Sequence, residues 1–168
     1  MSRYPELAAK VDAFFDRVMK RHSGEMACGR GCSHCCHVRL TVTSVEANAI
    51  RTLVSQMPEV NYSRLVDNVA LAAPDRCAAL TPGGLCLIYA ARPIVCRSHG
   101  APIRYKENSL PVIAACDENF MGIDDGPAGA DPDCVIDQET LSAMLLAVDR
   151  EAGGDGSRVD LAELLASL

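Results

Sequence analysis

Residues 28–37 read CGRGCSHCCH and place four thiols and two imidazoles within ten residues. This density of cysteine is too high for ordinary core packing and too local for a disulfide framework. Gly29 and Gly31 allow the backbone to turn tightly, so that several sulfur atoms can converge on one point. The spacing C-x3-C-x2-C-C therefore predicts a metal-binding loop with four candidate ligands, which are Cys28, Cys32, Cys35 and Cys36.

The composition of the chain is that of a small globular protein. Its 168 residues are enough to bury a core, and 49% of them are apolar. The net charge of −6 argues against nucleic acid as a main partner, because phosphate binding needs a basic face. No repeat or linker divides the sequence, and we expect a single domain over residues 1–168.

No segment of the sequence has the character of a membrane span. The N-terminal stretch MSRYPELAAKVDAFF lacks the apolar core of a signal peptide. No apolar run approaches the roughly 20 residues that are needed to cross a bilayer. We therefore expect no membrane partner and a cytoplasmic location, where thiols are kept reduced.

The remaining cysteines point to further metal ligands. The chain has nine cysteines, an odd number that cannot be fully paired, and reduced thiols in short spacings favour metal binding over disulfides. Four more candidate ligands are spread through a segment rich in proline and turn residues, namely Cys77, Cys86, Cys96 and Cys116. Cys134 stands alone after a loop, and we expect it to be a buried structural residue.

Hydrophobic periodicity predicts helices near both ends of the chain. Apolar residues recur at helical spacing over 4–22, and a capping box of Thr43 and Glu46 predicts a helix from there to about 57. Three further helices are expected over 62–73, over 138–150 with Asp137 as N-cap, and over 158–167 with Ser157 as N-cap.

The segment 77–116 is expected to be irregular, with short strands or single helical turns, because its prolines forbid long helices. The predicted fold class is therefore mainly α. We expect a small helical domain around an irregular cysteine-rich metal-binding centre at about 25–120, with C-terminal helices at about 137–168.

Arginine and histidine residues flank the predicted ligands. Arg92 and Arg97 lie on either side of Cys96, where a guanidinium would offset the negative charge of clustered thiolates. His99 and His34 could complete a site or orient a ligand. We predict that Arg92, Arg97 and His99 contact the bound cofactor.

The cysteine pattern resembles that of the YkgJ-type cysteine-cluster family. The resemblance rests on the motif at 28–36, the stretch GGLCLIYAARPIVCR at 83–97 and Cys116, and it covers about residues 25–120. It implies a zinc- or iron-chelating domain in which eight cysteines are the ligands. The family also includes flagellin lysine N-methylases, and similarity links these enzymes to an iron–sulfur cluster and S-adenosylmethionine.

Several functions are consistent with this pattern. The first is a cytosolic metal-binding protein that holds an iron–sulfur cluster through the eight cysteines, with zinc or iron ions as the alternative cofactor. The second is a methyltransferase-like enzyme that uses an iron–sulfur cluster and S-adenosylmethionine on a protein substrate. The third is a metal-handling or redox-sensing protein with a protein partner and labile metal. Whether the protein is an enzyme is left open.

Overall fold

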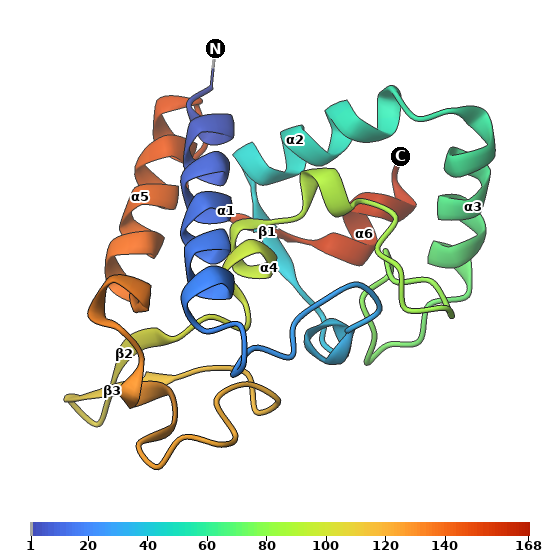
Figure 1. Cartoon of the computed structure of the whole chain (residues 1–168). Helices are drawn as coiled ribbons and strands as arrows, with labels where there is room; N and C mark the ends of the chain where they lie inside the picture. The colour runs from blue at the N-terminus through green and yellow to red at the C-terminus, as the bar shows by residue number, and fades with distance from the viewer. Residues whose placement is uncertain (1) are drawn as a thin grey trace. The chain divides into compact units, whose positions relative to one another are not determined.

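The computed structural model describes residues 2–168 and shows a mixed α/β protein (Figure 1). Helices account for 48% of the chain and strands for 12%. The described residues form six α-helices and five short strands. The expectation of a mainly α fold is therefore met only in part, because short paired strands accompany the helices and residues 158–160, which were expected to be helical, form one of them. Within residues 2–168, no helix is both long and apolar enough to cross a membrane.

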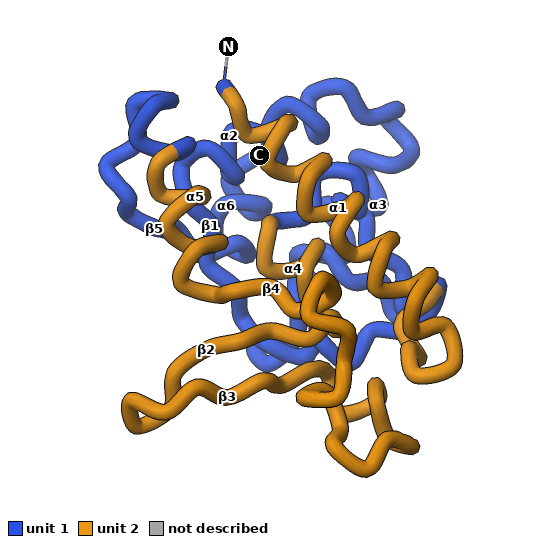
Figure 2. The backbone as a smooth tube through the Cα atoms, turned by 60° about the vertical axis from the view of Figure 1, so that its left-hand side comes forward, with its two compact units in different colours: residues 1–2, 30–93, 148–168 blue, residues 3–29, 94–147 orange. Residues whose placement is uncertain are grey.

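The chain divides into two compact units (Figure 2). Unit 1 contains residues 1–2, 30–93 and 148–168, and unit 2 contains residues 3–29 and 94–147. Each unit is thus completed by segments that are distant in the sequence. The expected single domain over 1–168 stays a prediction.

Unit 1 combines a two-stranded sheet with three helices. Its elements are β1 (Thr41–Thr43), α2 (Ser44–Ser55), α3 (Glu59–Ala70), β5 (Arg158–Asp160) and α6 (Leu161–Ala166). The two strands are antiparallel, with Val42 opposite Val159. The aliphatic core includes Ile50, Leu65 and Ile88, each almost inaccessible to solvent. Aliphatic side chains dominate this core, as expected from the scarcity of aromatic residues.

The N-terminus of α2 is fixed by two buried carboxylates. Thr43 and Glu46 form the predicted capping box, in which the Thr43 N–H donates to Glu46 Oε2 at 2.9 Å. The Val45 N–H donates to Asp149 Oδ1 at 2.8 Å. Because the N-terminus of a helix carries partial positive charge, it accommodates both acidic groups away from water.

The last helix differs from its expected position. Residues 158–160 pair with β1, so α6 begins at Leu161, and its N-cap is Asp160 rather than Ser157. Asp160 Oδ1 accepts the N–H groups of Ala162 at 2.9 Å and Glu163 at 3.1 Å. The pairing of residues 158–160 with β1 therefore prevents the helix from beginning directly after Ser157.

Unit 2 contains two helices, most of a third, and a three-stranded sheet. Its elements are α1 (Tyr4–Arg21), α4 (Ile94–Ser98), β2 (Ile103–Glu107), β3 (Leu110–Ala114) and β4 (Ile136–Asp137), followed by α5 (Gln138–Glu151), which continues into unit 1 at residue 148. α1 confirms the first predicted helix. Asp137 accepts the Thr140 N–H at 2.8 Å, which confirms it as the cap of α5.

The β2–β3 hairpin provides the short strands that were expected within 77–116. The two strands are antiparallel, and Glu107 lies opposite Leu110 across a two-residue turn. Asn108 and Ser109 both have positive φ, at 48° and 68°, as the favoured tight hairpin turn requires. β4 then pairs in parallel with β2, with Ile103 opposite Ile136.

The core of unit 2 lies along α1. Val18, Phe120 and Cys134 are buried there, and Cys134 is fully inaccessible. Its location agrees with the expectation of a structural cysteine. Cys28 packs against the same cluster, so one candidate ligand is anchored on this core.

Candidate metal centre

Unit 1 brings four cysteines together from separate segments. The first two, Cys35 and Cys36, lie in a 3₁₀ turn at His34–Cys36. The Cys77 N–H donates to the carbonyl oxygen of Cys36 at 2.8 Å, which places the next segment beside this turn. The fourth cysteine, Cys86, lies beside the segment that follows Cys77, because Leu80 and Cys86 form an isolated antiparallel β-bridge. We call these four the unit 1 thiols: Cys35, Cys36, Cys77 and Cys86.

The TPGG turn at 81–84 makes the return to Cys86 possible. The Thr81 N–H donates to the Leu85 carbonyl oxygen at 2.8 Å, and Thr81 Oγ1 accepts the Leu85 N–H at 3.0 Å. Gly84 has φ +76°, and a Cβ at this position would lie 3.3 Å from the Gly31 carbonyl oxygen. The turn signal in the sequence thus joins two ligand segments.

Backbone N–H groups donate to two of the unit 1 thiols. Burial raises the pKa of the Cys77 thiol, and hydrogen bonding by the backbone N–H groups of Ala79 and Leu80 lowers it by a smaller amount. The Ile88 N–H acts in the same way on Cys86, where burial again dominates and raises the pKa to about 11. Main-chain donors of this kind stabilise the thiolate that metal binding requires.

The unit 1 thiols oppose one another's ionisation. The pKa of Cys36 is raised far above its usual value, first by a hydrogen bond with Cys35, then by burial, and then by the charge of the other three thiolates. Four buried or half-buried thiolates would repel one another strongly without a cation among them. A bound metal ion would remove this repulsion by taking the place of the thiol protons.

These four thiols are neighbours without being arranged as a finished coordination shell. Among residues 2–168, no three His, Cys, Asp or Glu side chains converge closely enough to hold one ion. Charges interact over longer distances than a zinc–sulfur bond of about 2.3 Å, so this result is compatible with the interactions described above. Cys35, Cys36 and Cys86 are half-buried, whereas Cys77 is buried. The donor set fits a thiophilic metal.

Unit 2 contains three further candidate ligands, Cys28, Cys96 and Cys116, which we call the unit 2 thiols. The Cys28 sulfur accepts a hydrogen bond from Asn119 Nδ2 at 3.3 Å. The Asn119 N–H in turn donates to the Cys116 carbonyl oxygen at 2.8 Å. In sequence, the unit 1 thiols lie between the first and the last unit 2 thiols.

Gly100 allows the Cys28 side chain to approach the segment that follows Cys96. Its φ is +98°, and a Cβ at this position would lie only 2.5 Å from the Cys28 sulfur. Since real side-chain carbons do not approach so closely, no other residue fits here without displacement. The glycine after α4 is therefore part of the site.

The predicted arginine contacts have different surroundings. The Arg92 guanidinium carbon lies 4.1 Å from the centroid of the Tyr89 ring, and its charge lowers the pKa of Cys86. The buried Arg97 forms an ion pair with the partly exposed Asp12, with 2.5 Å between Nη1 and Oδ2. Arg92 thus lies where it offsets thiolate charge, whereas the charge of Arg97 is balanced by a carboxylate.

His34, His99 and Cys32 are not assigned to either group of thiols. His34 is exposed in the 3₁₀ turn, and His99 is exposed just after α4. Cys32 is half-buried in the loop between Cys28 and Cys35. Their roles as cofactor contacts or ligand stay predictions.

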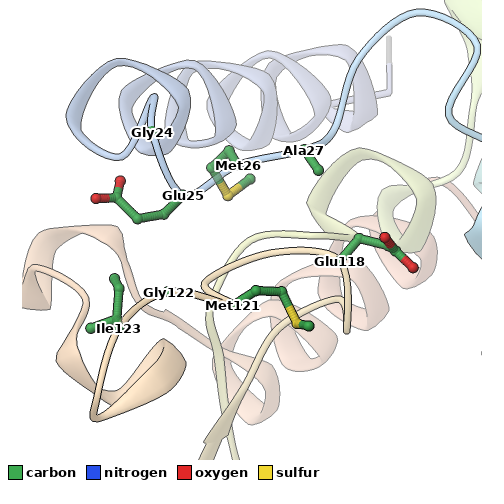
Figure 3. Close-up of a pocket in the computed structure, with 8 residues that line it drawn as sticks. All are labelled: Gly24, Glu25, Met26, Ala27, Glu118, Met121, Gly122 and Ile123. Atoms are coloured by element: carbon green, nitrogen blue, oxygen red, sulfur yellow. The ribbon is translucent and has the colours of Figure 1, made fainter.

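Unit 2 also has a pocket of about 310 Å³ (Figure 3). It is lined by Gly24, Glu25, Met26, Ala27, Glu118, Met121, Gly122 and Ile123. The carboxylates of Glu25 and Glu118 point in opposite directions from it. The pocket therefore lacks the convergent polar groups that define a cation site.

Sequence reasoning did not identify Asn119 as part of the site. A single asparagine in a loop rich in Gly, Asp and Pro carries no motif, and its three partners lie 19 to 92 residues away. Only its position three residues after Cys116 could have drawn attention to it.

Residues 27–117 match the model of the family described as "Putative zinc- or iron-chelating domain", CxxCxxCC. The match covers more than half of the chain and includes all eight predicted ligands. The chain therefore belongs to this family, and the membership supports metal binding by the matched region. No curated protein and no solved structure matches the chain significantly.

Proposed function

We propose that this member of the zinc- or iron-chelating family holds two metal centres, one at the unit 1 thiols and one at the unit 2 thiols. The observation that carries the proposal is the arrangement in unit 1. Four thiols from three segments interact there, and backbone N–H groups donate to the sulfur atoms of Cys77 and Cys86. Thiolates that are gathered and stabilised in this way are ligands for zinc or iron.

The unit 1 centre is proposed as a closed site. Four thiolates fill the four positions of a tetrahedral ion or of a cubane cluster, which leaves no position for a substrate. This property favours storage, structural or redox roles over methyl transfer at this centre. Arg92 is proposed to contribute by offsetting the charge of Cys86.

The cofactor is proposed to be an iron–sulfur cluster, with zinc as the alternative that the experiment distinguishes. Thiolate sulfur is the ligand type that iron–sulfur clusters take, and Cys32, the remaining cysteine of the motif at 28–36, is proposed as the eighth ligand. All nine cysteines are free thiols in this structure. We propose a reducing, cytoplasmic setting for the protein, where such thiols remain available for metal.

The test is metal and acid-labile sulfide analysis of protein purified without oxygen, together with its visible spectrum. Iron and sulfide in comparable amounts would identify a cluster, whereas colourless protein with tightly bound zinc would identify zinc sites. Protein that retains neither metal, and that binds neither on reconstitution, would overturn the proposal. Single replacements of Cys77 and Cys28 by serine should each remove only part of the metal.

A further inference from the structure

Asn119 is a buried polar residue whose side chain is completely engaged. It is 4% exposed. Its Oδ1 accepts the Ala27 N–H at 2.8 Å, and its Nδ2 donates to the Gly100 carbonyl oxygen at 2.7 Å and to the Cys28 sulfur at 3.3 Å. A side-chain amide offers two N–H groups and one carbonyl oxygen, and each of them has a partner here.

The partners determine the orientation of this amide. If the amide were rotated by half a turn, its NH₂ would face the Ala27 N–H and its oxygen would face the Gly100 carbonyl oxygen. Both encounters would be repulsive between buried groups. The N–H therefore points at the Cys28 sulfur.

The same residue joins the three segments that carry the unit 2 thiols. Ala27 precedes Cys28, Gly100 follows the helix of Cys96, and the Asn119 N–H donates to the carbonyl oxygen of Cys116. The next residue strengthens the connection, because the Phe120 N–H donates to the Glu25 carbonyl oxygen at 2.7 Å. Phe120 does so with φ at 59°, a strained value for a buried aromatic residue.

We infer that Asn119 is the positioning residue of the unit 2 centre, and that its N–H···S hydrogen bond withdraws charge from the Cys28 thiolate when metal is bound. The inference rests on the proposed function, since it assigns a role within the second of the two proposed centres. Hydrogen bonds to ligand atoms orient those ligands and tune the metal, and their removal typically weakens metal binding about 10- to 100-fold.

Two substitutions separate orientation from simple packing. Asn119→Asp keeps the acceptor for the Ala27 N–H and nearly the same shape, but it directs an oxygen with negative charge at the Cys28 sulfur. Asn119→Ala removes all three bonds and leaves buried backbone groups without partners. The matched control is Asn108→Asp, which makes the same change at the exposed hairpin turn of unit 2, where Asp also tolerates a positive φ.

The experiment loads the metal-free full chain with Co²⁺ and records affinity and the thiolate-to-cobalt charge-transfer band. The absorption that wild type shows and Cys28→Ser lacks is assigned to the unit 2 centre. Asn119→Asp should weaken Co²⁺ binding at this centre about tenfold or more and move its band to longer wavelength, because the sulfur loses a hydrogen-bond donor. Asn108→Asp should leave both unchanged.

A purely structural Asn119 would give a different result. Its variants would then melt at lower temperature while the band of the loaded centre kept its wavelength, and that outcome overturns the inference. If Cys28→Ser changes no part of the cobalt spectrum, the proposed unit 2 centre itself is wrong, which is a separate failure.

The wild-type protein offers a measurement that does not depend on a variant that folds. With ¹¹³Cd²⁺ as the bound probe, the Asn119 side-chain amide protons should show a scalar coupling to cadmium through the Cys28 sulfur. The absence of this coupling, in protein whose Cys28 does couple to cadmium, would overturn the inference.

Discussion

The two groups of thiols stabilise sulfur charge by different means. In unit 1, the donors to Cys77 and Cys86 are backbone N–H groups, which are set by the path of the chain. In unit 2, the donor to Cys28 is the side chain of Asn119. A main-chain donor is retained by every substitution except proline, whereas a side-chain donor is lost in most, so the unit 2 centre is the one that single substitutions tune more readily.

Replacing Cys77 with serine should have the largest effect and is the strongest test of this comparison. Cys77 is the buried member of the unit 1 thiols, and a serine hydroxyl is a poor ligand for zinc or iron. The variant should lose the metal of unit 1 and, with it, stabilisation on the order of 10 kcal/mol if the site behaves like other structural thiolate sites. Metal analysis and thermal unfolding without oxygen measure both effects.

Cys28→Ser is the matched control, since it should remove the metal of unit 2 and retain that of unit 1. If each variant alone lost all metal, the two groups would form one shared centre, and the comparison would fail.

Cys134→Ser tests whether every cysteine of unit 2 is a ligand. Cys134 is fully buried in the aliphatic and aromatic core, where a hydroxyl without a partner costs about 1–3 kcal/mol. Chemical denaturation should show this loss, and the metal content should not change. Cys134→Ala, which adds no polar group, should cost less. Loss of metal in both variants would make Cys134 a ligand.

Asp160→Ala probes unit 1 away from its thiols. Removing the cap of α6 should cost about 1 kcal/mol at neutral pH. Arg39 and the N–H groups of Ala162 and Glu163 hold the pKa of Asp160 below its usual value. The contribution is therefore fully present above about pH 4 and is lost as the pH falls through the lowered pKa.

Denaturation of wild type and Asp160→Ala as a function of pH measures this difference, which should shrink in acid. Metal content at neutral pH should be the same in both proteins. A stability difference that grows as the pH falls would contradict the assigned sign.

Arg92→Gln should have the smallest effect. The guanidinium lowers the pKa of Cys86 and lies against Tyr89, so its loss should weaken metal binding in unit 1 about twofold to fivefold. Competition with a coloured chelator measures the affinity. Arg104→Gln, which removes an exposed arginine of unit 2, should leave it unchanged. Equal effects of the two variants would indicate a non-specific change in net charge.

Local signals in the sequence predicted the helices well. The caps of α2 and α5 are formed by Thr43 with Glu46 and by Asp137. Each cap bonds to groups only three residues away, so a short stretch of sequence is enough to predict it. The strand at 158–160 could not be predicted in the same way, because it forms only by pairing with residues 41–43. The hairpin turn was also hidden, since Asn108 and Ser109 adopt positive φ without a glycine.

The cysteine motif identified the candidate ligands but not their grouping. Cys35 and Cys36 join Cys77 and Cys86, whereas Cys28, from the same motif, lies in the other unit. The TPGG turn is local, but the division also depends on the hydrogen bond from the Cys77 N–H to the Cys36 carbonyl oxygen, which joins residues far apart in the sequence. The contacts of Asn119 are tertiary in the same sense.

The nested order of the two thiol groups has a consequence for how the protein is made. A chain leaving the ribosome presents Cys28 first, but the unit 2 thiols are complete only when Cys116 has emerged. The unit 1 thiols are complete thirty residues earlier, at Cys86. The four unit 1 thiols have therefore all been made while the nascent chain still lacks the last ligand of unit 2, although β5 and α6, which complete unit 1, are made last. Metal can then reach the unit 1 thiols before the set of thiols that includes Cys28 is complete.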